Sequence, residues 1–138
     1  MAEKLAFELV APERLLASLE AEMVVAPGAE GDFGVLPQHA PLVALLRPGV
    51  IRVYEGDKVT KRVFVAGGFA EVNARGFSIL AEEAEPVEEI DAEEARRRLR
   101  DAEEDLADAR EPSEAERRRL EQAIEIARAR LEAVEHPV

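Results

Sequence analysis

The organisation of this chain is set by residues 77–99, which read FSILAEEAEPVEEIDAEEARRRL. Before Pro86 lie all of the aromatic residues and glycines, and apolar residues tend to alternate with polar ones. After Pro86 the sequence is rich in Ala, Arg, Glu and Leu and contains no glycine. A hydrophobic period that changes from two to about 3.6 residues predicts strands followed by helices. We therefore expect two domains, residues 1–86 and 87–138.

The first domain reads as a series of short strands joined by turns. Residues 23–26 end at the turn signal Pro27-Gly28, and the pair Gly67-Gly68 suits a two-residue hairpin between two apolar segments. The apolar residues of the first expected strand share one face: Leu5, Phe7 and Leu9. No helical stretch intervenes that could connect parallel strands. The expected fold class of this domain is an antiparallel β-sandwich.

Two capping boxes indicate helix starts in the second domain. Asp91 stands three positions before Glu94, and Ser113 stands three positions before Glu116. In such a box the first side chain accepts a backbone N–H that the first helical turn leaves unpaired. Pro112 breaks the chain between them. We expect a C-terminal antiparallel α-helical hairpin with helices at about residues 92–110 and 114–135.

Each expected helix has one narrow apolar seam with steps of three and four residues. The first seam comprises Ala92, Ala95, Leu99, Ala102, Leu106 and Ala109, and the second comprises Leu120, Ile124, Ala127, Leu131 and Val134. Alanine buries little area, and at roughly 25 cal/mol per Å² such a seam barely offsets the entropy of ordering two helices. The tail should be marginally stable and able to open or to dock elsewhere.

Composition argues against several classes of partner and site. The net charge of −12 disfavours nucleic acid and anionic lipid surfaces, which would repel the chain. The absence of cysteine excludes disulfides, thiolate nucleophiles and cysteine-based zinc sites. Residues 1–4 lack a basic leader followed by an apolar run. The longest apolar stretch, residues 40–46, is far shorter than the roughly 20 residues that span a membrane, so no direct membrane insertion is expected.

The densest motif is residues 30–42, EGDFGVLPQHAPL, whose glycines and prolines predict a tight, rigid loop. His39 in this motif is a candidate general base, but neither serine nor cysteine lies nearby to act as a nucleophile. We therefore favour a structural or interface role for His39. The alternative is a small β-sandwich enzyme, an isomerase or a metal-dependent hydrolase, that uses His39.

No other pattern indicates a catalytic residue, a cofactor or a metal. The glycines do not match a phosphate-binding loop. The glutamates before the tail lack the turn-forming residues of a Ca²⁺ or Mg²⁺ loop and favour a solvated linker. These glutamates are Glu82, Glu83, Glu85, Glu88 and Glu89.

Each expected helix also carries a basic cluster. The members are Arg96, Arg97 and Arg98 in the first, and Arg117, Arg118 and Arg119 in the second. Glutamates four positions earlier can pair with Arg97, Arg98 and Arg118 on a solvated helix face, which is worth only about 0.2–0.5 kcal/mol per pair. Since arginine pairs carboxylates in a bidentate manner, the clusters suit docking to an acidic partner equally well. Both interpretations stay open.

Several of these segments together resemble the epsilon subunits of F-type ATP synthases, called delta in mitochondria. They are residues 30–42, the segment LLRPGV at 45–50, and GGFAEV at 67–72. A strand-rich domain followed by a helical hairpin is similar to the family's organisation over essentially the whole chain. The resemblance implies a non-catalytic rotor subunit in the central stalk of a proton-translocating bacterial enzyme. It also implies a peripheral position on the cytoplasmic face of the inner membrane.

The resemblance further implies partners for particular residues. Those expected to face the c-ring are Glu30, Gly31 and Asp32, and those expected on the side of the gamma subunit are His39, Pro41 and Leu42. In many members of the family the helical pair can extend along gamma into the catalytic alpha/beta head and block hydrolysis. The six clustered arginines are then candidates for regulatory docking on that head.

Two positions depart from the family's pattern. Gln38 stands where the family usually has glycine, which suggests that the loop needs no positive φ there. ATP-binding members carry I/L-D-x-x-R-A where this chain has Ile90 to Ala95, with Glu94 in place of the arginine. Because a carboxylate repels a triphosphate, we expect no ATP binding. A nucleotide-sensing module is therefore the least favoured alternative.

Overall fold

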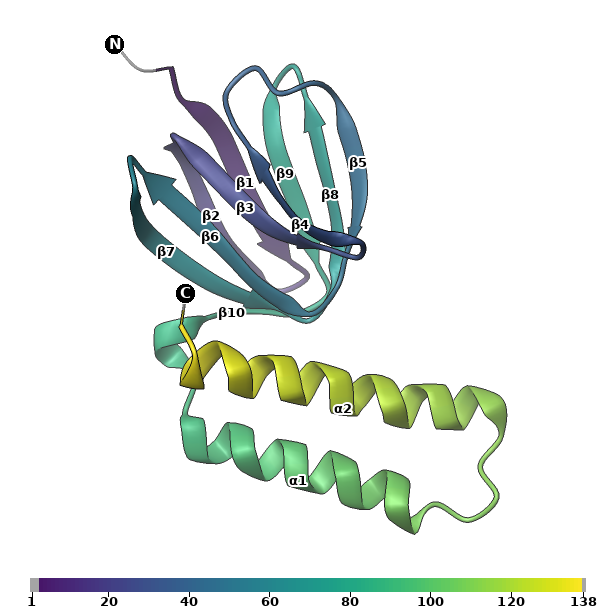
Figure 1. Ribbon diagram of the computed structural model, residues 1–138. Coiled ribbons are helices and arrows are strands. Elements are labelled where there is room, and N and C mark those ends of the chain that lie inside the picture. Colours follow the sequence, from purple (N-terminus) through teal and green to yellow (C-terminus); the bar gives the residue numbers. More distant parts are fainter. Residues whose placement is uncertain (1–2, 138) are drawn as a thin grey trace. The chain divides into compact units, whose positions relative to one another are not determined.

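The computed structural model describes residues 3–137, which form ten strands, two α-helices and one 3₁₀ helix (Figure 1). The strands are β1 (Leu5–Ala11), β2 (Arg14–Ala21), β3 (Met23–Gly28), β4 (Gly31–Val35), β5 (Leu42–Leu46), β6 (Gly49–Glu55), β7 (Lys58–Val65), β8 (Gly68–Asn73), β9 (Gly76–Ala81) and β10 (Ala84–Pro86). The helices are η1 (Val87–Glu89), α1 (Ala92–Asp108) and α2 (Glu114–Glu135). Contacts divide the chain into two compact units, residues 1–88 and 89–138. The predicted fold class, a β-sandwich followed by a helical hairpin, is confirmed.

The core of the first unit follows from alternation along its strands. The inward residues of β1 are buried and the residues between them are mostly exposed, as its pattern predicts. Phe77 of β9 is the aromatic centre, with its ring 5.6 Å from that of Phe7 and 6.3 Å from that of Phe33. These rings join apolar side chains from both layers, and their removal from water stabilises the unit.

Strand pairing runs through the unit in the order β10-β7-β6-β3-β5-β8-β9-β1-β2, with β4 paired to β3. A single bridge, Gly28 to Leu46, connects β3 to β5 and so links the two halves of this path. All pairs are antiparallel except β1 and β9, which are parallel. These two strands lie far apart in sequence, and the intervening strands of the sandwich make the crossover that a helix makes elsewhere.

Two predicted turns are wrong. The pair Gly67-Gly68 does not form a hairpin, because β7 pairs with β6 and β10 while β8 pairs with β5 and β9. Both glycines have positive φ, and a Cβ on Gly68 would overlap the Leu80 carbonyl oxygen. The chain therefore crosses from one layer to the other at these glycines, where the backbone of Gly68 lies close to that of Leu80. Pro27 and Gly28 are the last two residues of β3, so they do not form the turn predicted for them. The turn falls at residues 29–30.

The two helices of the helical unit begin where the capping boxes predict, and α1 ends at Asp108, two residues before the expected end. The Asp91 carboxylate accepts the N–H groups of Glu93 (2.8 Å) and Glu94 (3.2 Å), and the Ser113 hydroxyl accepts that of Glu116 (3.1 Å). The residues of both predicted seams are buried or half-buried, and α1 and α2 pack on one another. The connection between them contains Glu111 in the left-handed region, with φ 44°.

Candidate partner-binding surfaces

A row of apolar side chains crosses the outer face of one layer of the sandwich. Strand register pairs Leu45 of β5 with Phe69 of β8, and Phe69 with Leu80 of β9. Leu80 pairs with Val10 of β1, which pairs with Leu15 of β2. Leu45, Leu15, Leu80 and Phe69 are 72%, 60%, 48% and 41% exposed. We call these five residues the outer row. A contiguous exposed apolar patch of this kind indicates a surface for another protein.

The neighbouring row of the same face is mostly polar. It lies two positions away along β5, β8, β9 and β1, and three positions away along β2, where the β1–β2 register shifts. It comprises Val43, Glu71, Ser78, Glu8 and Ser18. Because alternate residues of a strand share a face, both rows point to the same side of the sheet. A partner that covers the outer row therefore meets a polar boundary on this side.

The β3–β4 hairpin carries the residues predicted to face the c-ring. Glu30 is exposed in the turn, and Gly31 follows it with φ +139°, a conformation that L side chains rarely adopt. Asp32 is not free, because its Oδ1 lies 2.6 Å from Arg47 Nη2 and its Oδ2 lies 3.4 Å from Arg52 Nη2. The three predicted residues are thus neighbours in space but differ in their contacts.

The motif that contains these residues is only partly a loop. Residues 31–35 form β4, and residues 36–41 alone connect β4 to β5. In this connection the Nδ1–H of His39 donates to the Ala40 carbonyl oxygen at 2.6 Å, and the ring is exposed. Pro41 is exposed as well, whereas Leu42 is half-buried and packs against the core.

The expectation for Gln38 is wrong. Its φ is +66°, so the loop adopts at this position the left-handed conformation that glycine tolerates best. The Gln38 side chain donates to the Glu3 carboxylate at 3.2 Å, which offsets part of the strain. The sequence did not reveal that a non-glycine residue adopts a left-handed φ at this position.

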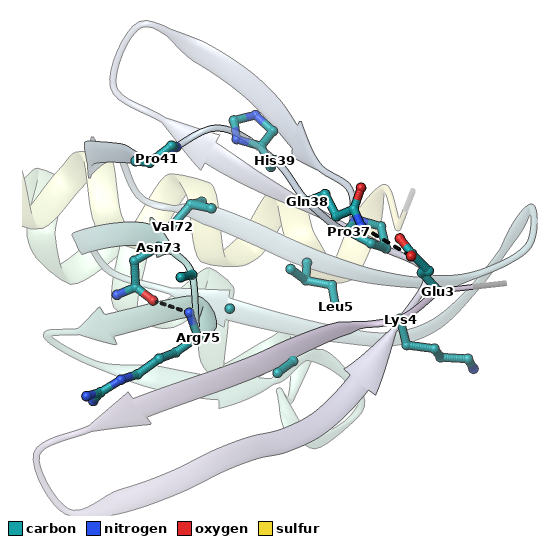
Figure 2. Close-up of a pocket in the computed structure, with 13 residues that line it drawn as sticks. Glu3, Lys4, Leu5, Pro37, Gln38, His39, Pro41, Val72, Asn73 and Arg75 are labelled. Carbon is teal, nitrogen blue, oxygen red and sulfur yellow. Dashed lines mark hydrogen bonds between the residues drawn. The ribbon is translucent and has the colours of Figure 1, made fainter.

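A shallow depression of about 620 Å³ lies beside His39 (Figure 2). Its walls come from the start of β1, the 36–41 connection and the β8–β9 turn. Leu5 and Val72 contribute apolar surface, while the side chains of Lys4 and Arg75 extend away from it in Figure 2. Lys4 is paired with Glu55 at 2.8 Å. The residues that line this depression present His39 with neither a carboxylate hydrogen bond nor a nucleophilic side chain.

The clustered arginines of the helical unit divide into two groups. Arg96 pairs with Glu135 of the facing helix at 3.2 Å, and Arg98 pairs with Glu94 at 2.5 Å. Arg118 lies 3.8 Å from Glu114 with both side chains largely exposed. The predicted pair of Glu93 with Arg97 is not found among residues 3–137. The exposed members of the clusters without an ion pair in that range are Arg97, Arg117 and Arg119.

Glu94 has a contact that the sequence did not reveal. Its Oε1 lies 2.7 Å from Nη1 of Arg130 on α2, whose side chain is only 7% exposed. Hydrogen bonding and charge pairing with Arg130, with a smaller contribution from Arg98, lower the pKa of the Glu94 carboxyl below its ordinary value of 4.5 against the opposing effect of burial. A second interhelical pair joins Arg128 to Glu103 at 3.9 Å. Ion pairs thus supplement the thin alanine seam.

Residues 3–137 contain no group of three or more His, Asp or Glu side chains placed to hold a metal ion. Neither α1 nor α2 combines the length and apolar character that crossing a membrane requires.

Comparison with known proteins places this geometry in one family. Residues 4–87 match the family model described as ATP synthase, Delta/Epsilon chain, beta-sandwich domain. The ATP synthase epsilon chain of Rhodospirillum rubrum is 52% identical over 133 residues, which cover 96% of this chain and 98% of that protein. This chain belongs to the ATP synthase delta/epsilon chain family. It is a non-catalytic subunit of ATP synthase.

Other members of the family and solved structures agree. The ATP synthase epsilon chain of Paramagnetospirillum magneticum is 57% identical over 110 residues, covering 80% of this chain and 83% of that protein. A chain in the cryo-EM structure of the Euglena gracilis mitochondrial ATP synthase, OSCP/F1/c-ring, superposes with a TM-score of 0.78 and 34% identity, covering 96% of this chain and 82% of that chain. A chain of the Tetrahymena thermophila central stalk and c-ring shares the fold, with a TM-score of 0.64 and 18% identity over 96% of this chain and 97% of that chain.

In this family member, sequence reasoning missed the outer row and both arginine contacts of Asp32. A signal for the row was present, because residues 42–46 read LVALL without a polar residue. A continuous apolar run indicates a strand covered on both faces, yet only Leu46 of these five is fully buried. No sequence pattern predicted the contacts of Asp32, because Arg47 and Arg52 become its neighbours only when the strands pair.

Proposed function

We propose that the sandwich is the adaptor that joins the gamma subunit to the c-ring, at the cytoplasmic side of the membrane, and that the helical unit is a conditional inhibitor of ATP hydrolysis. The observation that carries the first part is the outer row. An exposed row of large apolar side chains across five strands is costly in water unless a partner protein covers it.

The arrangement of β5 supports an adaptor with two separate contacts. At the start of this strand lie His39 and Pro41, predicted for the gamma side. At its end the Ala29 N–H donates to the Leu45 carbonyl at 2.9 Å, which places the turn that holds Glu30 there. A five-residue strand separates the two by roughly 15 Å. Two partners can therefore be held at the same time.

The outer row is the candidate contact for gamma because it starts at Leu45, beside the hairpin, and runs away from the hairpin across β8, β9, β1 and β2. Interfaces of stable complexes have apolar centres and polar rims, and the row with its polar neighbour has that composition. The acidic turn adjoins the Leu45 end of this row but differs from it in chemistry.

A matched pair of substitutions tests the docking surface. Leu80→Lys places a charge in the outer row, and Ser78→Lys places the same charge two positions away in the polar row of the same strand and face. We expect Leu80→Lys to weaken binding of the full chain to purified gamma subunit at least tenfold, because a lysine is desolvated there. Ser78→Lys should change it less than twofold. Equal effects, with both variants folded by circular dichroism, would refute the assignment.

The inhibitory role is supported by the thin seam and by the exposed arginines of the helical unit. Alanines dominate the α1 side of the seam, so opening the hairpin costs little buried apolar area. Arg97, Arg117 and Arg119 are then available for acidic surfaces of the catalytic head. A chain that ends at Glu88 should keep its binding to gamma and raise the ATPase activity of the reconstituted enzyme. Unchanged hydrolysis would remove this half of the proposal.

We also infer that the helical unit does not sense ATP. Glu94 pairs with both Arg98 and Arg130, so each of these cations already has a carboxylate partner that would repel an approaching phosphate. Calorimetric titration of the full chain with ATP should show no binding below millimolar concentration. A micromolar dissociation constant would show that this reasoning about Glu94 is wrong.

A further inference from the structure

The helical unit is a hairpin that is joined covalently at one end only. The helices α1 and α2 lie side by side, and residues 109–113 connect the end of α1 to the start of α2 (Figure 1). The start of α1 therefore lies beside the end of α2, as in any antiparallel hairpin. We call this the free end of the hairpin. Side-chain contacts, and not a loop, hold the two helices together there.

Ion pairs join the two helices at this free end. Glu94 is in the first turn of α1, and its Oε1 lies 2.7 Å from Nη1 of Arg130 near the end of α2. Arg96 also pairs with Glu135 across the hairpin, at 3.2 Å, but their side chains are 49% and 36% exposed. A pair that is so exposed is screened by water and salt and contributes little. The pair of Glu94 with Arg130 is therefore the stronger of the two.

Arg130 is buried in the closed hairpin. The buried residues of the two helices are Ala95, Ala127, Arg130 and Ala133. Alanine side chains bury little apolar area, so they hold the helices together only weakly. A buried guanidinium is unfavourable without a counter-charge, and the carboxylate of Glu94 supplies one. The stability of the closed hairpin thus depends on the charge of Glu94.

Glu94 has two arginine partners, and they respond differently to opening. Arg98 follows Glu94 by one turn of α1, so this pair is kept when the helices separate. Arg130 belongs to α2, so its pair with Glu94 forms on closing and is lost on opening. The pair between the helices therefore distinguishes the closed hairpin from an open one.

The connection at the other end has the properties of a hinge. Residues 109–113 lie between α1 and α2, and Glu111 among them has φ 44°. A left-handed backbone is unfavourable for a residue other than glycine. Glu111 is also exposed, so a change of its φ meets little steric resistance. Rotation at this connection therefore relieves strain and opens the free end.

We propose that the ion pair of Glu94 with Arg130 is a latch, which holds the free end of the hairpin closed and yields when the hairpin opens about residues 109–113. The consequence for hydrolysis rests on the proposed function, in which the open helices inhibit the enzyme. The balance between the closed and open forms is then set by a contact within the chain, without a bound nucleotide. Weakening the latch should increase inhibition.

The first test measures hairpin opening in the full chain without any partner. The chain has no cysteine, so Ala127→Cys introduces a single thiol, at a position that is 8% exposed and is labelled by a thiol reagent when the hairpin opens. In this background Glu94→Gln should speed labelling about 30-fold, because the closed hairpin then holds Arg130 without its counter-charge. Circular dichroism should show unchanged helix content.

Two controls remove a charge from α1 and leave the latch intact. Glu104→Gln acts on an exposed carboxylate that has no ion pair within residues 3–137, and Arg98→Gln removes only the pair within the helix. Each should change the labelling rate about twofold or less. Equal acceleration by Glu94→Gln and either control, or no acceleration by Glu94→Gln, would overturn the latch.

A double variant tests whether the unpaired Arg130 is the cause of opening. Replacing both partners by uncharged side chains leaves no buried charge. Glu94→Gln combined with Arg130→Met should therefore be labelled at least about fivefold more slowly than Glu94→Gln alone. A double variant that is labelled as fast as the single one would refute the role of Arg130.

The second test measures ATP hydrolysis by the reconstituted enzyme. Glu94→Gln should lower the rate at least about threefold relative to Glu104→Gln, and the double variant should recover most of this loss, because inhibition follows the population of open hairpins. If labelling responds as expected but hydrolysis does not, the inhibitory function fails and the latch stands. If labelling does not respond, the latch fails whatever the rate of hydrolysis.

Discussion

Replacing Glu94 by glutamine should loosen the helical hairpin without changing its shape. Glutamine has the same length as glutamate and keeps an oxygen that can accept from Arg130, but it carries no charge. The variant therefore removes the ionic part of the contact between α1 and α2, in which Arg130 Nη1 lies 2.7 Å from Glu94 Oε1, together with the more exposed pair of Glu94 with Arg98. A matched control is Glu93→Gln, which removes an acid from the same first turn.

The magnitude follows from the burial of the two partners. Breaking a fully buried ion pair costs about 3–5 kcal/mol, because one charge is left uncompensated. Here the Arg130 side chain is 7% exposed, but that of Glu94 is 26% exposed, and the amide oxygen of glutamine can still accept from Arg130. We therefore expect the hairpin to lose about 2 kcal/mol. Glu93→Gln should cost no more than about 0.5 kcal/mol, the part due to the helix dipole.

Hydrogen exchange of the full chain measures this difference for the helices alone. A loss of about 2 kcal/mol raises the exchange rate of amides protected by hairpin opening about 30-fold. We expect this acceleration in both α1 and α2 for Glu94→Gln and little change for Glu93→Gln. Equal acceleration in the two variants, or none in either, would refute the reasoning about the Glu94–Arg130 pair.

The pH dependence of the stability of the helical hairpin provides a second test of the same pair. Because the pKa of Glu94 is lowered on folding, its contribution to stability is complete above 4.5 and is lost as pH falls through the lower folded-state pKa. The original chain and Glu94→Gln should therefore differ at neutral pH and converge in acid. A difference that persists well below the folded-state pKa would contradict the assignment of the effect to the carboxylate charge.

Two further pairs of substitutions test the backbone of the sandwich, each by urea denaturation. Gly68→Ala should destabilise it by about 3 kcal/mol or more, because φ is +140° and the added methyl overlaps the Leu80 carbonyl. The control Gly34→Ala, where the nearest atom to an added Cβ is 3.6 Å away, should cost far less, and similar losses would contradict the steric argument. Gln38→Gly should be about 1 kcal/mol more stable than Gln38→Ala, since only glycine relieves the left-handed φ; equal stabilities would show that position 38 carries no strain.

The sequence by itself predicted the division of the chain and the type of each unit. The patterns that carried this prediction each involve residues a few positions apart. They are the change of period near Pro86, the alternation of Leu5, Phe7 and Leu9, and the caps at Asp91 and Ser113. Such signals are local, so they can be read without knowing which strands pair. The same holds for the pair of Arg98 with Glu94 within one helical turn.

Only the tertiary structure decided which distant residues became neighbours. The Gly67-Gly68 segment crosses between layers instead of forming a hairpin, the outer row takes its members from five strands, and Asp32 meets Arg47 and Arg52 through strand pairing. Glu94 likewise finds Arg130 on the facing helix. The physical reason is that a strand or helix specifies its own buried face by its period, whereas the order and register of its partners depend on how all buried faces pack together.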